Sequence, residues 1–98
     1  MKLGTLDSHQ SKMFFLMDEV MSEILSDFKY YMAVYTPHTP QHKDAKVFLS
    51  QGHDELAAYF YNAVMSRCRA GGYYSDARFA GSDFLKKSID KRLKQYGL

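Results

Sequence analysis

Between Met13 and Tyr35 the apolar side chains recur at the spacing of an α-helix, and this stretch constrains the fold more than any other part of the chain. Steps of three or four residues separate the members of one apolar stripe, which are Met13, Met17, Val20, Ile24, Phe28, Tyr31 and Tyr35. The opposite face carries acidic and small polar side chains, namely Asp18, Glu19, Ser22, Glu23, Ser26 and Asp27. Because residues three and four apart share one side of a helix, the pattern predicts an amphipathic helix over residues 8–35, with Asp7 or Ser8 as its N-cap.

Two prolines end this first helix, because Pro37 and Pro40 both disfavour a helical conformation at the residue before them. The apolar period then resumes and predicts a second long helix that begins near residues 40–43. It should end at Gly71 and Gly72, since glycine readily adopts the left-handed conformation that terminates many helices.

The last part of the chain predicts a shorter helix over residues 82–96. Residues 73–81 are expected to form a loop with one helical turn, or else part of an unbroken helix from Ser75 to Tyr96. No convincing strand is present. The predicted fold is therefore all-α, with an antiparallel helical hairpin of two long helices and a shorter third helix packed across it.

Small side chains on the second predicted helix, among them Ala57 and Ala58, suggest that the first helix approaches it closely there. A chain of 98 residues is expected to form a single helical domain over residues 1–98.

Composition points to a cytoplasmic protein. Cys68 is the only cysteine, so no disulfide forms within the chain, and a lone cysteine is typical of a reducing compartment. The first residues lack the apolar run of a secretory signal. The longest uncharged segment, residues 30–41, contains two prolines and does not resemble a membrane span.

No motif for catalysis or metal binding stands out, and we expect neither enzymatic activity nor a cofactor. His38 and His42 are four residues apart, but Pro40 lies between them. The paired Glu-x-x-His motifs of a di-metal bundle are absent. Cys68 lies between two arginines, which would lower its pKa if they were close, yet neighbouring residues diverge on a helix.

The best candidate for a ligand site is the turn that follows the second predicted helix. It combines three arginines and two tyrosines beside the glycine pair, namely Arg67, Arg69, Tyr73, Tyr74 and Arg78. Guanidinium groups bind phosphate and tyrosine rings stack on bases, so this turn could hold a phosphate-bearing ligand. The alternative is a helix-ending turn whose arginines complement the helix dipole.

Charge is distributed unevenly along a chain whose net charge is +2. Residues 1–35 hold three basic and five acidic side chains, whereas residues 36–98 hold ten basic and six acidic ones. The last segment forms a candidate basic patch of Lys86, Lys87, Lys91, Arg92 and Lys94. Such a patch could contact nucleic acid, although it is also typical of a solvated helix face.

The first helix is apolar over nearly half its circumference, which is more than one partner helix covers. The candidate interface consists of Phe14, Met17, Met21, Leu25, Phe28 and Met32. A thin core of this size favours covering the excess with a second copy or another protein.

The leading interpretation is a non-enzymatic helical interaction module that occludes or bridges a partner protein, as a homo-oligomer. In size and helix content the chain resembles small helical immunity proteins and phage-encoded inhibitors, which implies an inhibitor or regulator but no residue roles. The alternative is a nucleotide or nucleic-acid binding protein that uses the arginine–tyrosine turn and the basic final helix.

Overall fold

The computed structural model describes residues 7–98, and this part of the chain is helical throughout, with no strand. Its helices are α1 (Ser8–Val34), α2 (Pro40–Leu49), α3 (His53–Gly71), α4 (Tyr74–Ala80) and α5 (Ser82–Gln95). The all-α class is therefore confirmed. The segment on which we predicted the lack of a secretory signal begins with residues 1–6, which lie outside the described range.

Local signals explain both ends of α1. Asp7 is the N-cap, and its carboxylate accepts a hydrogen bond from the backbone N–H of Gln10 at 2.7 Å. The Gln10 side chain accepts in return from the backbone N–H of Asp7, which completes a capping box. At the other end the backbone becomes extended at Tyr35, two residues before Pro37.

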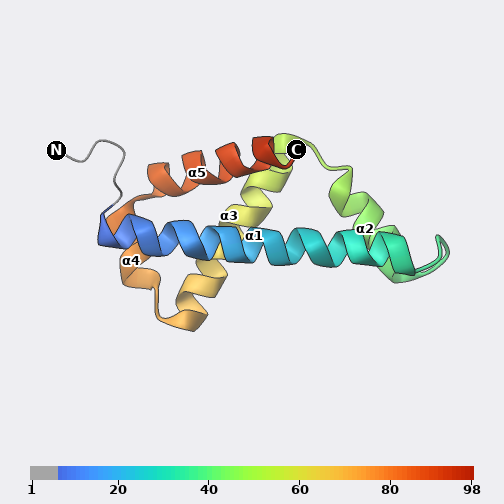
Figure 1. The fold of residues 1–98 in the computed structure, drawn as a ribbon, viewed down its shortest axis with the longest axis horizontal. Coiled ribbons are helices and arrows are strands. Elements are labelled where there is room, and N and C mark those ends of the chain that lie inside the picture. Colours follow the sequence, from blue (N-terminus) through green and yellow to red (C-terminus); the bar gives the residue numbers. More distant parts are fainter. Residues whose placement is uncertain (1–6) are drawn as a thin grey trace.

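The prediction of one long second helix is wrong, because the backbone breaks between α2 and α3. The Ser50 hydroxyl donates to the carbonyl of Val47 at 3.0 Å, and serine bonded to its own backbone competes with helix continuation. Gly52 then adopts an extended conformation as the N-cap of α3. Because the chain turns at this point, α3 crosses α1 instead of running alongside it (Figure 1).

Residues 73–81 are not part of a continuous final helix, and the single helical turn expected in this segment extends over seven residues. They form the short helix α4, which Gly72 and Gly81 separate from its neighbours. Both glycines have positive φ, +80° and +92°, a region that other residues rarely adopt. Gly72 ends α3 as predicted, and the break at Gly81 agrees with the alternative in which a separate final helix begins near residue 82.

The core lies between the first two-thirds of α1 and helices α3, α4 and α5. α1 contacts all four other helices, and α3 packs against α5 (Figure 1). The largest fully buried side chains include Phe60, Met13, Met17, Met21, Leu56, Leu85, Ile89 and Leu93. The contacts thus describe a bundle around α1 rather than a hairpin crossed by a third helix.

The end of α1 and α2 form an arm, residues 26–49, that projects from the bundle (Figure 1). No side chain of α1 beyond Leu25 is fully buried. Phe28 and Phe48 stack across the arm with ring centroids 4.2 Å apart. The radius of gyration is 15.0 Å, compared with about 13 Å for a compact domain of this length.

Within residues 7–98, no helix has the length and apolar character needed to cross a membrane.

Candidate functional site

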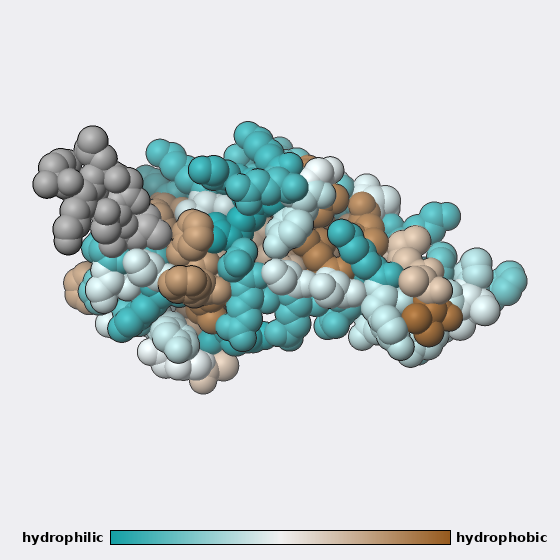
Figure 2. All heavy atoms as spheres, in the orientation of Figure 1, coloured by the Kyte–Doolittle hydropathy of each residue, from teal (hydrophilic) through white to brown (hydrophobic). Residues whose placement is uncertain are grey.

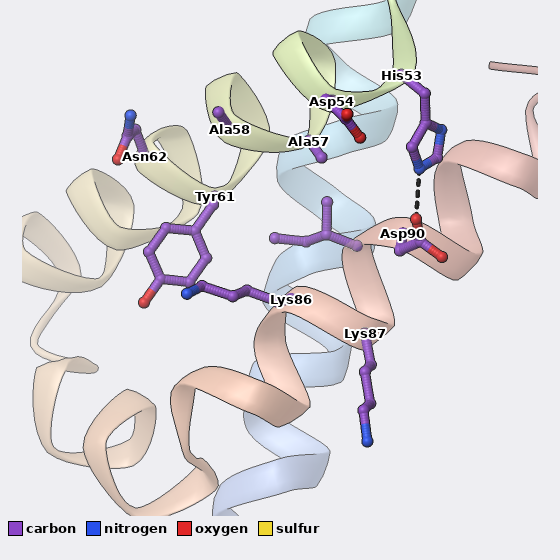
Figure 3. A pocket seen from close by; sticks show the side chains of 10 residues that line it. His53, Asp54, Ala57, Ala58, Tyr61, Asn62, Lys86, Lys87 and Asp90 are labelled. Carbon is purple, nitrogen blue, oxygen red and sulfur yellow. Dashed lines mark hydrogen bonds and ion pairs between the residues drawn. The ribbon is translucent and has the colours of Figure 1, made fainter.

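A groove runs along the outer side of the bundle between α3 and α5 (Figure 3). We call it the α3–α5 groove. It has a volume of about 590 Å³ and is lined by His53, Asp54, Ala57, Ala58, Tyr61, Asn62, Lys86, Lys87, Ile89 and Asp90. The α3 residues form two rows at helical spacing, so they share one face of that helix. The volume is in the range of sites that hold a ligand or an anchoring side chain.

Small side chains create the hollow. Ala57 and Ala58 occupy the middle of the α3 wall, where they leave space above Ile89 of α5. Ile89 is only 1% exposed, so it lies beneath the groove as part of the apolar core. The sequence had suggested that both alanines face the first helix, but Ala58 is exposed to solvent. Small residues such as Ala57 and Ala58, with no facing helix to fill the space beside them, were the sequence feature that could have predicted this groove.

One end of the groove is closed by His53. Its Nε2 is hydrogen-bonded to Oδ1 of Asp90, and its Nδ1 lies 3.1 Å from the backbone carbonyl oxygen of Leu98 (Figure 3). Lys94 lies 3.1 Å from the other carboxylate oxygen of Asp90. These contacts join the start of α3 to α5 and to the end of the chain.

The charges in this cluster support one another. The hydrogen bond to Asp90, together with that to the Leu98 carbonyl, raises the pKa of His53. The hydrogen bonds from His53 and Lys94 lower the pKa of Asp90. Both ring nitrogens of His53 thus have an acceptor within hydrogen-bond distance, and these contacts link the start of α3 to α5 and to Leu98.

The other end of the groove is basic and aromatic. Lys86 extends towards α3, and its ammonium lies 5.6 Å from the centroid of the Tyr61 ring (Figure 3). Lys87 points away from α3 in the same view. Neither lysine forms an ion pair with any residue in the described range. Two positive charges without carboxylate partners thus border an apolar floor.

The three arginines of the predicted arginine–tyrosine turn have different surroundings. Arg67 lies 3.5 Å from Glu23 of α1, in a pair that is partly exposed and weak. Arg69 lies over the ring of Tyr74 at 6.0 Å. Arg78 is exposed in the last turn of α4, four residues after Tyr74.

Tyr73 takes part in ending α3. Its backbone N–H donates to the carbonyl of Cys68 at 2.8 Å, and Gly72 adopts the left-handed conformation between them. Its side chain borders a small hollow with Phe15 of α1. The turn is thus at least a helix-ending structure, and its use as a ligand site stays a prediction.

Arg92 does not belong to the exposed basic patch. Only 5% of its surface is accessible, and its guanidinium lies 3.9 Å from the centroid of the Phe14 ring. It donates hydrogen bonds to the backbone carbonyls of Phe14 and Ser88, and its Nε lies 3.5 Å from Asp18. Arg92 therefore links α5 to α1. The other four members of the patch are exposed: Lys86, Lys87, Lys91 and Lys94.

The candidate interface on α1 is divided by the fold. Met17, Met21 and Leu25 lie in the core of the monomer, so they are not available to a partner in this conformation. Phe28 and Met32 are half-buried in the arm. Phe14, at the other end of α1, is 41% exposed, so the uncovered part of that interface is split between the arm and the start of α1.

An aromatic patch at the start of α1 was not singled out from the sequence. Phe15 is 74% exposed and Phe79 is 71% exposed, and the Phe79 ring stacks on His9 at 4.8 Å. Figure 2 shows brown, hydrophobic side chains over this end of α1. His9 Nδ1 lies 2.7 Å from Asp76, and this hydrogen bond lowers the pKa of Asp76.

Nucleophilic and metal chemistry find little support in the described part of the chain. Cys68 is buried against the Met13 sulfur at 3.8 Å, and burial raises the pKa of its thiol, which disfavours the reactive thiolate. Within residues 7–98, no three histidine, cysteine, aspartate or glutamate side chains are grouped as a metal site would require.

Comparison of the chain with protein-family models, curated proteins and solved structures gives no match.

Proposed function

We propose that this protein is a non-enzymatic helical interaction module that binds a partner protein in the α3–α5 groove. The observation that carries the proposal is an open, apolar-floored hollow between two helices, bordered by lysines that lack carboxylate partners. In other proteins, apolar grooves between helices bind a helix or peptide whose side chains fill the groove. Binding there would occlude the segment that docks or bridge it to another surface.

The engaged state of His53 supports binding over catalysis. It is the residue of the groove with the most usual catalytic side chain, and both of its ring nitrogens already have acceptors. No serine, threonine or cysteine lines the groove beside it. The groove therefore offers a shaped surface and charge, which are the elements of recognition.

Self-association is a second part of the proposal, and the arm favours it. Val34 and Val47 are more than half exposed, and Tyr30 is exposed beside them on α1. Figure 2 shows hydrophobic surface at this end of the molecule as well. The arm carries Asp27 and Asp44 against Lys29, Lys43 and Lys46, so two arms can approach with little net repulsion.

Nucleotide or nucleic-acid binding remains the alternative. Arg69 and Tyr74, with Arg78 one helical turn further on, are the residues that favour it. Because such binding depends on phosphate charge, it should weaken steeply with salt.

The test fills the groove without disturbing the core. Ala58→Trp places a large ring on an exposed position of the groove, and Ala70→Trp makes the same change on an exposed part of α3 outside it. Each immobilised protein would be exposed to extract of the source cells, with and without nuclease treatment, and retained proteins would be quantified by mass spectrometry. We expect a partner retained equally by wild type and Ala70→Trp and at least about tenfold less by Ala58→Trp.

Equal retention by all three proteins would contradict the groove as the binding site. Retention that disappears after nuclease treatment would instead favour the nucleic-acid alternative.

A further inference from the structure

We infer that the occupant of the α3–α5 groove is an amphipathic helix of a partner protein, with one large apolar side chain at its centre and acidic residues beyond it. The inference rests on the proposed function and names the chemistry of its ligand. The apolar side chain would pack on Ala57, Ala58 and Ile89. The carboxylates would meet Lys86, and Lys87, which lines the groove but points away from α3, would add positive charge at its edge.

The dimensions of the groove fit a short stretch of helix. Its α3 wall runs from His53 to Asn62, which corresponds to about 14 Å of helix, or between two and three turns. Alanines at a helix–helix contact allow the axes to approach to the lower end of the usual range, about 8 Å. An occupant helix can therefore lie close over Ala57 and Ala58, with its anchoring side chain inserted above Ile89.

Charge sets the direction of the occupant. At the His53 end, Asp90 is already engaged by His53 and Lys94, while Asp54 forms no ion pair within the described residues. At the Tyr61 end, Lys86 is equally without a carboxylate. A helix whose positive N-terminal end lies near Asp54 and whose acidic residues lie near Lys86 satisfies both ends.

Two other occupants can be compared with a helix of a different protein. Nucleic acid fits less well, because it would bring phosphates near Asp54 and Asp90, and no arginine lines the groove. A second copy would offer Phe15, which is 74% exposed one turn before Asp18 and Glu19 on α1, and its binding would make the protein associate with itself through the groove. Self-association that Ala58→Trp abolishes would overturn a different protein as the occupant.

The experiment is a selection from helical peptides that carry randomised residues and are displayed on phage. The full-length protein is the target. Ala58→Trp serves as the counter-target. We expect enriched peptides to share one large apolar residue followed within a turn or two by Asp or Glu. Purified peptides should bind Ala58→Trp at least about tenfold more weakly than wild type, as measured by fluorescence anisotropy.

The double variant Lys86→Glu/Lys87→Glu tests the charge directly. Both lysines are exposed, so the variant is expected to fold, and circular dichroism checks this for each protein. The selected peptides should bind it at least about tenfold more weakly, and versions with Asp and Glu replaced by Lys should recover affinity. Lys86→Gln/Lys87→Gln tests how peptide affinity changes when the two charges are removed without being reversed. Ala58→Glu is a second variant that fills the groove.

Different outcomes would contradict the acidic occupant and the groove as the binding site. Peptides that lose binding to Ala58→Trp but ignore both lysine variants would overturn the acidic occupant and leave the proposed function standing. Peptides that bind wild type and Ala58→Trp equally would contradict the groove itself. A selection that enriches nothing, or enriches basic peptides, also counts against an acidic helix.

Discussion

At the scale of single residues, two side chains link helices through polar contacts. His53 is hydrogen-bonded to Asp90 and to the Leu98 carbonyl oxygen, and Arg92 reaches from α5 to the backbone of α1. Neither role follows from the sequence, because each contact joins residues far apart in the chain. The arginine had been predicted to belong to an exposed basic patch. Both side chains instead link helices.

The His53–Asp90 pair predicts a pH-dependent stability. The folded-state pKa of His53 is raised, so its contribution is complete below its unfolded pKa and is lost as pH rises through the folded value. The pKa of Asp90 is lowered, so its contribution is lost as pH falls through that value. The pair therefore stabilises the fold most between the ordinary pKa values of the two groups, above 3.8 for Asp90 and below 6.5 for His53.

We expect His53→Gln to lower the melting temperature relative to wild type at about pH 5.5 and to lower it much less at about pH 9. Thermal unfolding followed by circular dichroism at both pH values measures the difference. His38→Gln is the control, since His38 is exposed and has no hydrogen bond from its side chain within the described residues. Equal deficits for His53→Gln at the two pH values would show that the pair is not the cause.

Arg92 predicts a stability effect that a surface lysine does not share. Arg92→Ala removes hydrogen bonds to two backbone carbonyls and the contact with the Phe14 ring, so we expect unfolding free energy to fall by about 1–3 kcal/mol. Lys91→Ala, at the exposed neighbouring position, should change it by less than about 0.5 kcal/mol. Urea denaturation compares the two. If Arg92→Ala left the unfolding free energy unchanged, Arg92 would belong to the exposed basic patch instead.

At the scale of helices, periodicity predicted where helix exists, and backbone detail decided where it breaks. The period of α1, its Asp7 cap and the Gly72 stop follow from local sequence, and all three are confirmed. The break at Ser50–Gly52 was missed because the apolar period continues across it. The groove was missed for a related reason: Ala57 and Ala58 indicate a close approach without indicating which partner approaches.

At the break between α4 and α5, Gly81→Ala should change the unfolding free energy in opposite directions for a broken and a continuous helix. In the fold described, Gly81 has φ of +92°, so Gly81→Ala should cost about 1–2 kcal/mol. In a continuous helix from Ser75 to Tyr96, the same change would instead stabilise by about 1 kcal/mol, because alanine is the better helix former. Chemical denaturation gives the sign.

Gly52→Ala is the matched control for this substitution. Gly52 has φ of −71°, and a Cβ there meets only the mobile end of the Glu55 side chain. We therefore expect a smaller loss than at Gly81. A gain in stability at Gly81 would favour the continuous helix.

At the scale of the whole molecule, the elongated shape leaves the arm with little support. The bundle is organised around the first part of α1, while the arm is two helices packed chiefly on each other. Two helices alone can cover only one face of each, and Val34 and Val47 remain exposed as a result. A second arm related by two-fold symmetry would turn this pair into a four-helix bundle.

This arrangement predicts a homo-oligomer held by the arm. Light scattering at micromolar concentration should give a mass that is a multiple of 11.3 kDa. Val34→Lys with Val47→Lys should reduce it to the monomer mass, because two buried charges without partners oppose association. Phe15→Ser alters the aromatic patch at the other end and should leave the mass unchanged. A monomeric wild type would remove self-association from the proposal, and a monomer produced by Phe15→Ser alone would place the interface on the aromatic patch.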